Sequence, residues 1–168
     1  MSRIERSVAV AARPERVFGF VAAEWETDLA FAAGRSFDWS PRSPARLRRG
    51  FRVTFQGSLV GLDGPVELEV VECAEPEGWV AHSTAGAAFT WAWRFVDEGA
   101  VCRATQICDY RPSARWRRLL EWGVGRRRRA DALRRSLERL KLLVERQESL
   151  ERRRESGIAD GRSRGNSQ

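Results

Sequence analysis

Histidine and cysteine are scarce in this sequence of 168 residues, which limits the metal and disulfide chemistry open to it. His82 is the only histidine, and the three cysteines, Cys73, Cys102 and Cys108, show no Cys-x-x-Cys spacing. Structural zinc sites draw their ligands mainly from these two residue types, so a zinc site is not expected. If Cys102 and Cys108 share one strand, six residues separate them by about 20 Å, too far for a disulfide. We expect no metal, no cofactor and no disulfide framework.

Long hydrophobic runs are also missing. The longest uncharged stretch, residues 78–93, is interrupted by polar residues and is shorter than the roughly 20 apolar residues of a membrane-spanning helix. The N-terminal MSRIERSVAV carries charges and no apolar core, unlike a secretory signal. These features predict a cytoplasmic protein.

Lysine is nearly absent, since 29 of the 30 basic residues are arginine, and the positive charge is confined to one part of the chain. Residues 1–112 hold 13 basic and 15 acidic residues, a net charge of −2, whereas residues 113–168 hold 17 and 8, a net charge of +9. Seven arginines and one glutamate fall within residues 113–129. Such a block is typical of a solvated helix face, but it also fits a surface for anionic lipid or nucleic acid.

The remaining composition and patterning predict one α+β domain over residues 1–150 and a polar, disordered tail over residues 151–168. Hydrophobic residues make up 42% of the chain, enough for a core at this length. Alternation and turn signals predict a strand at 4–10, a helix at 12–23, a second short helix at 24–36 and a loop at 40–50. Five strands should follow, at 51–56, 66–70, 79–84, 90–95 and 101–110, as an antiparallel meander. A C-terminal helix is predicted by the apolar stripe Leu133, Leu137, Leu140 and Val144.

Several motifs resemble those of one superfamily. They are IERSVAVAARPERVFGFVA at the start, VVECAEP at 70–76, FTWAWRF at 89–95, DYRP at 109–112 and LRRSLERLKLLVE at 133–145. In order and spacing over residues 3–146 they resemble the polyketide cyclase/dehydrase and lipid-transport, START-like (SRPBCC) superfamily. The resemblance implies a helix-grip fold, in which a curved antiparallel sheet wraps around a long C-terminal helix, with two short helices after the first strand. It also implies an apolar cavity for a lipid, polyketide or quinone, whereas only some members are enzymes.

The strand alternation selects the residues that would line such a cavity. Gln106 is notable among them, because a buried amide needs a hydrogen-bond partner, which a ligand or a water could supply. The same residues would also fit an ordinary close-packed core. The predicted ligand-binding residues are Phe55, Leu68, Trp91, Trp93 and Gln106 of the strands, together with Trp39 and Trp122, which lie outside the predicted strands.

Catalysis is a separate hypothesis, in which the protein is a polyketide cyclase or aromatase. Enolisation and aldol closure need a proton donor and acceptor, and His82 and Tyr110 are the candidate catalytic residues. The pattern leaves open whether Val80 and His82 or Trp79 and Ala81 face inward. No nucleophile elbow, phosphate loop or paired-carboxylate motif is present.

A third hypothesis places the function on the surface of the Arg-rich helix 113–129. The residues Trp116, Leu119, Leu120 and Trp122 with their flanking arginines would lie on an anionic membrane, and Arg126, Arg127, Arg128 and Arg129 form the basic surface. Binding to RNA or the ribosome would be nonspecific, because positive charge without an aromatic sheet platform reads no sequence. The expected partner is therefore a small hydrophobic ligand, with peripheral membrane contact as an alternative and nucleic acid not favoured.

Overall fold

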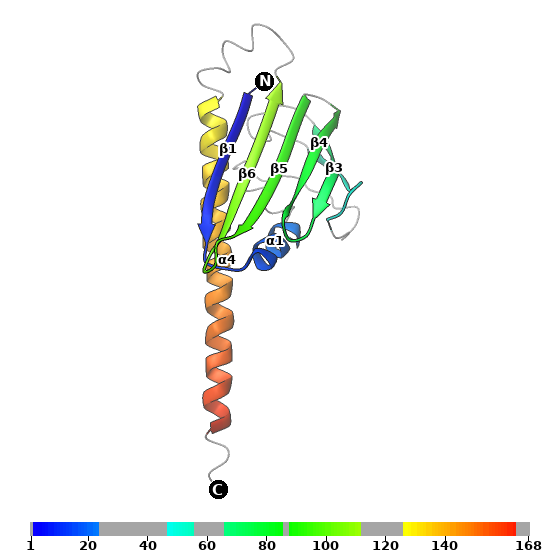
Figure 1. Ribbon diagram of the computed structural model, residues 1–168. Coiled ribbons are helices and arrows are strands. Elements are labelled where there is room, and N and C mark those ends of the chain that lie inside the picture. The colour runs from blue at the N-terminus through cyan, green and yellow to red at the C-terminus, as the bar shows by residue number, and fades with distance from the viewer. Residues whose placement is uncertain (1, 24–46, 56–65, 86–87, 112–125, 164–168) are drawn as a thin grey trace.

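In the part of the chain that the structure describes, the fold combines an antiparallel sheet with a short and a long helix, as the computed structural model shows (Figure 1). The structure describes residues 2–23, 47–55, 66–85, 88–111 and 126–163. The strands are β1 (Ser2–Val10), β2 (Arg52–Phe55), β3 (Val66–Ala74), β4 (Gly78–Ala85), β5 (Ala88–Asp97) and β6 (Cys102–Arg111). The helices are α1 (Pro14–Ala23) and α4 (Arg126–Ser163).

The sheet has six strands in the order β1-β6-β5-β4-β3-β2, and every neighbouring pair is antiparallel. Strands β2 to β6 are therefore neighbours in both sequence and space, which confirms the predicted meander. The first strand joins it at the far edge by pairing with β6, with Val8 opposite Ala104. The expected α+β architecture, an open antiparallel sheet with a C-terminal helix, is confirmed.

The two faces of the sheet follow from the alternation of side chains. The inner face, which we define as the one bearing Val10, Trp93 and Gln106, is buried, and α1 and α4 pack on this side. In β4, Trp79 and Ala81 are buried whereas His82 is exposed. This settles the phase of β4, with Trp79 and Ala81 inward and His82 outward.

Helix α1 begins at Pro14, whose fixed φ suits the first helical position. Its buried residues Val17, Phe18 and Val21 face β5 and β6. The Phe18 ring meets the Phe95 ring edge-on, with centroids 5.9 Å apart. Helix α1 thereby covers one end of the inner face.

Helix α4 packs chiefly against β1. Its stripe Leu133, Leu137, Leu140 and Val144 is buried, as predicted. Polar bonds fix the helix next to the β1–α1 connection, since Lys141 Nζ donates to the Ala9 carbonyl at 2.9 Å and the Ala11 N–H donates to Glu145 Oε1 at 2.9 Å. The position of α4 along β1 is therefore set by both apolar and polar contacts.

The C-terminal segment differs from the expectation of a tail that begins at residue 151. Helix α4 continues to Ser163 and projects beyond the sheet (Figure 1). Residues 145–155 are mainly Glu, Arg, Gln and Leu, which favour helix without burial. Glu148 and Glu151 also form ion pairs with Arg16 of α1, the first with a distance of 3.2 Å. Fading of the apolar stripe after Val144 thus ends the burial of the helix but not the helix itself.

Some predicted features lie outside the described residues. These are the second short helix at 24–36, most of the loop at 40–50 and the apolar residues of the Arg-rich helix, Trp116, Leu119, Leu120 and Trp122.

Candidate functional site

Aromatic side chains dominate the centre of the inner face. Three tryptophans of the adjacent strands β4 and β5 are at most 2% exposed: Trp79, Trp91 and Trp93. Trp79 and Trp91 have ring centroids 6.1 Å apart, and the rings of Trp93 and Phe95 stack at 5.8 Å with an interplanar angle of 11°. These two ring pairs make this part of the inner face an aromatic surface.

A polar side chain, Gln106 of β6, lies beside that surface. It is 1% exposed and directly opposite Trp93 in the β5–β6 register. Neither amide atom of Gln106 has a hydrogen-bond partner among the described residues, and the same holds for Trp93 Nε1. Cross-strand neighbours have Cβ atoms about 4.5–5.5 Å apart, so these three polar atoms belong to one small region. A buried polar group without a partner costs about 1–3 kcal/mol, so this pair is costly to the folded state unless another group satisfies it.

Small residues flank Gln106 along β6. Cys102, Ala104 and Cys108 share its face and are buried. Both cysteines are free thiols. Burial raises the pKa of Cys102 to about 11, so this thiol stays protonated and unreactive at neutral pH. The β6 side of the site therefore offers little bulk and no nucleophile at Cys102.

Arg6 also belongs to this region, although it is not among the predicted site residues. It pairs with Gln106 from β1, so one row across the sheet reads Arg6, Gln106, Trp93 and Trp79. The Arg6 side chain is exposed, and its Nη1 donates to the Glu5 carbonyl at 2.8 Å. The signal was present in the sequence, because Arg6 has the same alternation phase as Ile4, Val8 and Val10.

Four of the predicted ligand-binding residues share the buried inner face: Leu68, Trp91, Trp93 and Gln106. Phe55 lies in β2, where it pairs with Val66. Trp39 and Trp122 lie outside the described residues. The structure therefore brings the central members of the predicted set together on β3, β5 and β6.

The two candidate catalytic residues are not brought together. Tyr110 is buried on the inner face at the end of β6, whereas His82 is exposed on the outer face of β4. In the register, His82 is opposite Glu69 and Thr90, which also face outward. Since the sheet separates them, His82 and Tyr110 do not form one acid/base pair.

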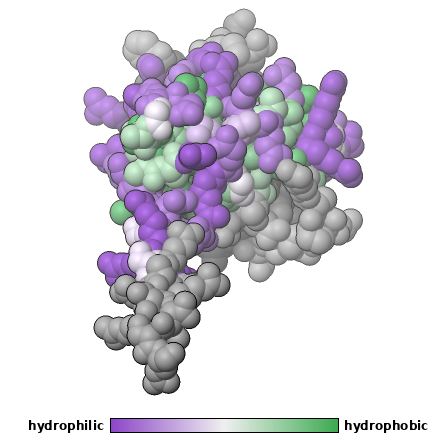
Figure 2. Space-filling model, turned by 60° about the horizontal axis from the view of Figure 1, so that its bottom comes forward, coloured by the Kyte–Doolittle hydropathy of each residue, from purple (hydrophilic) through white to green (hydrophobic). Residues whose placement is uncertain are grey.

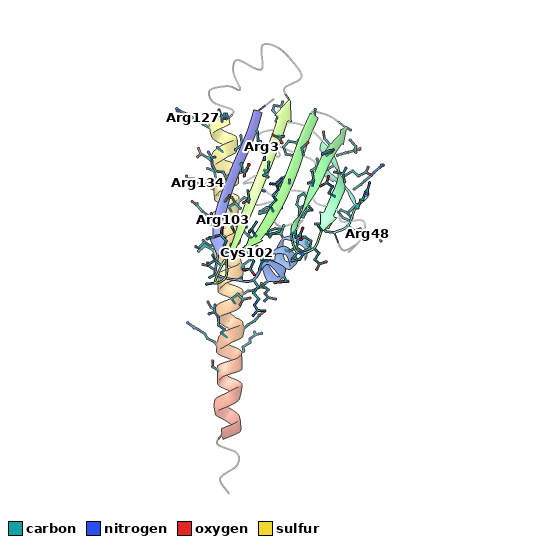
Figure 3. The ribbon with its side chains drawn as sticks, viewed as in Figure 1. Arg3, Arg48, Cys102, Arg103, Arg127 and Arg134 are labelled. Atoms are coloured by element: carbon teal, nitrogen blue, oxygen red, sulfur yellow. The ribbon has the colours of Figure 1, made fainter. Side chains whose placement is uncertain are left out.

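The predicted basic surface at the start of α4 lies away from this interior. Arg126 and Arg127 are exposed at the start of α4, and Arg128 and Arg129 follow in its first turn. Arg127 and Arg134 extend from the helix away from the sheet (Figure 3). The described surface seen from the lower end of the molecule is mainly hydrophilic, with apolar residues visible only in small patches (Figure 2).

Metal binding and membrane spanning have no support within the described residues. No group of three or more His, Cys, Asp or Glu side chains there could hold a metal ion. In the same part of the chain, no helix combines the length and the apolar character needed to cross a membrane.

Comparison with known proteins gives a fold but no family. No family model and no curated protein matches the chain. Among solved structures, the protein TTHA0849 from Thermus thermophilus is similar, with a TM-score of 0.62 and 18% identity over 85% of this chain and 97% of that one. BH1534 from Bacillus halodurans gives a TM-score of 0.57 and 15% identity over 84% and 97%. Ms6760 from Mycobacterium smegmatis gives 0.56 and 16% over 84% and 89%. At these identities the likeness establishes that the chain shares their fold.

Proposed function

We propose that this protein binds a small hydrophobic or aromatic ligand, of the lipid, polyketide or quinone type, between the inner face of its sheet and helix α4. The proposal includes the finer fold suggested by the sequence motifs, a START-like helix-grip domain. The observation that carries it is the pair of Gln106 and Trp93, whose amide and indole polar atoms are buried without partners among the described residues.

The composition of the inner face supports this proposal over a purely structural core. Ligand sites are mostly apolar and contain a few polar groups that orient the ligand. Here the apolar part is supplied by Trp79, Trp91 and Trp93, and the polar part by Gln106. A core that served stability alone would gain by replacing the unpaired amide with an aliphatic side chain.

A binding role is favoured over the cyclase hypothesis. Enolisation requires a proton acceptor and donor next to the same substrate. Of the two candidates, only Tyr110 lies on the inner face, and His82 lies on the other side of the sheet. The inner-face site orients a ligand by hydrogen bonds and, among the described residues, contains no histidine that could exchange a proton with it.

The experiment that tests the proposal is capture of a ligand by the purified full chain. The protein is incubated with a hydrophobic extract, and native mass spectrometry identifies retained compounds. A bound compound raises the unfolding temperature, because a ligand at 100 times its dissociation constant stabilises the folded state by about 2.7 kcal/mol.

The test variant and its control change adjacent residues of β6. Gln106→Phe fills the site from inside, whereas Thr105→Val changes a side chain that faces outward and shares a hydrogen bond with Ser7. We expect Gln106→Phe to lose the captured compound and Thr105→Val to keep it. Retention of no compound by the wild-type protein, or equal retention by a folded Gln106→Phe variant, would contradict the proposal.

A further inference from the structure

The unpaired polar atoms of the inner face also restrict the chemistry of the ligand. We infer that the ligand is uncharged and carries a hydrogen-bond donor directly beside an acceptor at one end of a flat aromatic body, as in an amide, a lactam or a hydroxy-carbonyl group. This inference rests on the proposed function, because it assumes that the site takes a small molecule.

The donors and acceptors of Gln106 and Trp93 restrict the polar group of the ligand. Gln106 offers two N–H donors and a carbonyl acceptor, and the Trp93 indole offers one N–H donor and no acceptor. All three heavy atoms are buried and have no partner among the described residues. A ligand with acceptors alone would leave Gln106 Oε1 unsatisfied, and a ligand with donors alone would leave the N–H groups unsatisfied. Only a ligand with both functions side by side satisfies the whole set.

The charged side chains around the site restrict the charge of the ligand. None of the charged side chains that the structure describes is buried, and the buried polar residues are Thr105, Gln106 and Ser136. Arg6 is the charged residue in the same row as Gln106 and Trp93, but it is exposed and its Nη1 already donates to the Glu5 carbonyl. A carboxylate at Gln106 would therefore be buried without a buried cation, which is costly. The site favours a neutral polar group.

The aromatic side chains next to Gln106 favour a flat aromatic body for the ligand. The Trp93 indole stands next to Gln106 and is stacked with Phe95 at an interplanar angle of 11°. Trp79, opposite Trp93 in β4, is tilted by 60° against Trp91. Aromatic faces of this kind gain most from contact with another flat ring in offset or edge-on geometry. An aromatic body beside Trp93 would place its polar end at Gln106.

The test uses four probes that share one naphthalene body and differ at a single position. 2-Naphthamide carries a donor and an acceptor, 2-acetonaphthone an acceptor, 2-naphthoate a charged acceptor and 2-ethylnaphthalene neither. Dissociation constants are measured on the wild-type full chain by isothermal titration calorimetry at about pH 7.5. Because the added donor satisfies a buried acceptor, we expect the naphthamide to bind about tenfold more tightly than the acetonaphthone. The naphthoate should bind more weakly than the naphthamide.

The outcomes separate this inference from the proposed function. If the naphthamide and the acetonaphthone bind equally, or if the naphthoate binds most tightly, the inference is wrong but the ligand site stands. If none of the four probes binds and no compound is captured from the extract, the proposed function itself fails.

Variants of Gln106 and Trp93 test whether these two residues cause the preference for the naphthamide. In Gln106→Leu the naphthamide should lose its tenfold advantage, whereas 2-ethylnaphthalene should still bind. Trp93→Phe removes one donor and keeps an aromatic ring, so it should reduce the affinity of both carbonyl probes by a similar factor. Thr105→Val, which changes the outer face next to Gln106, should leave the preference intact. Persistence of the tenfold preference in Gln106→Leu would overturn the inference, and Gln106→Met provides the same comparison if the leucine variant does not fold.

Discussion

Replacing Gln106 with leucine should make the ligand-free protein more stable. The side chain is 1% exposed, and its two amide atoms have no partner among the described residues. Burial of an amide without a hydrogen bond costs about 1–3 kcal/mol, and a leucine of similar volume avoids that cost. We therefore expect Gln106→Leu to raise the free energy of unfolding by about 1–3 kcal/mol. For a chain of this size, each kcal/mol corresponds to a rise of about 2–4 °C in Tm.

The assay is urea and thermal unfolding, followed by circular dichroism, of protein refolded from denaturant so that any carried ligand is removed. The matched control is Thr105→Val, in which the adjacent side chain of β6 loses a partnered hydroxyl. Thr105 Oγ1 and Ser7 Oγ are 2.9 Å apart. Loss of this hydrogen bond should lower the free energy of unfolding by about 1 kcal/mol. Gln106→Leu should thus raise the free energy of unfolding, whereas Thr105→Val should lower it.

A decrease of more than about 1 kcal/mol in Gln106→Leu would refute the reasoning. Such a result would mean that the amide has hydrogen-bond partners in the free protein. The observation on which the ligand site rests would then be lost, whatever the probes showed.

Three further predictions concern the framework around the site. A Cβ on Gly78, which has φ +146°, would lie 2.1 Å from the Trp93 carbonyl oxygen, so Gly78→Ala should lower the free energy of unfolding by about 2 kcal/mol or more. Gly50 has φ +81° and no atom within 4 Å of an added Cβ, so Gly50→Ala should lower it by only about 1 kcal/mol. Urea unfolding measures both values. Lys141→Met removes the 2.9 Å hydrogen bond to the Ala9 carbonyl and should lower the free energy of unfolding by about 1 kcal/mol. The control is Arg146→Met, which changes an exposed side chain and should leave the free energy of unfolding unchanged. The pKa of Cys102 is raised from 9.0 to about 11, so the thiol of the unfolded state loses its proton at a lower pH than that of the folded state. The free energy of unfolding should therefore fall by about 2–3 kcal/mol between pH 9 and 11. If the free energy of unfolding varied with pH in the same way in the wild-type protein and in Cys102→Ala, this prediction would be wrong.

The order of the strands could be predicted from the sequence because short turns join consecutive strands and most of these strands have a clear alternation. Trp91, Trp93 and Phe95 alternate with smaller or polar residues, and their inward direction follows directly. In β4 the pattern was ambiguous, since Trp79 and Val80 are both apolar and adjacent. The pairing with β5, which places Trp79 opposite Trp93, resolves the ambiguity and turns His82 outward.

The extent of α4 was harder to predict from the sequence. The apolar stripe ends at Val144, which correctly marks the end of burial. The helix continues because its later residues favour helix and because Glu148 and Glu151 find a partner in Arg16. Arg152, four residues further along the helix, donates its Nε to the Glu148 backbone carbonyl at 3.3 Å. A partner on another helix, far away in the chain, leaves no local pattern.

Only part of the candidate site could be predicted from the sequence, for a related reason. Alternation identifies Gln106 as an inward polar residue, but it does not show which side chains are next to it. That information is in the register, which places Trp93 on one side of Gln106 and Arg6 on the other. Whether a buried amide is satisfied depends on these neighbours, so its missing partners are a property of the fold.

The position of α4 decides what an occupant of the site would contact. Lys141 and Glu145 hold the helix to the residues that follow β1, and its apolar stripe packs chiefly on β1 rather than on β5. Helix α1 covers the other end of the inner face through Phe18 and Phe95. Gln106 and Trp93 belong to the two strands next in order after β1, beside the main contact of α4 rather than beneath it. A ligand there would rest its body on β4 and β5 and touch the helix with its edge, so changes in α4 should alter affinity less than changes at Gln106 or Trp93.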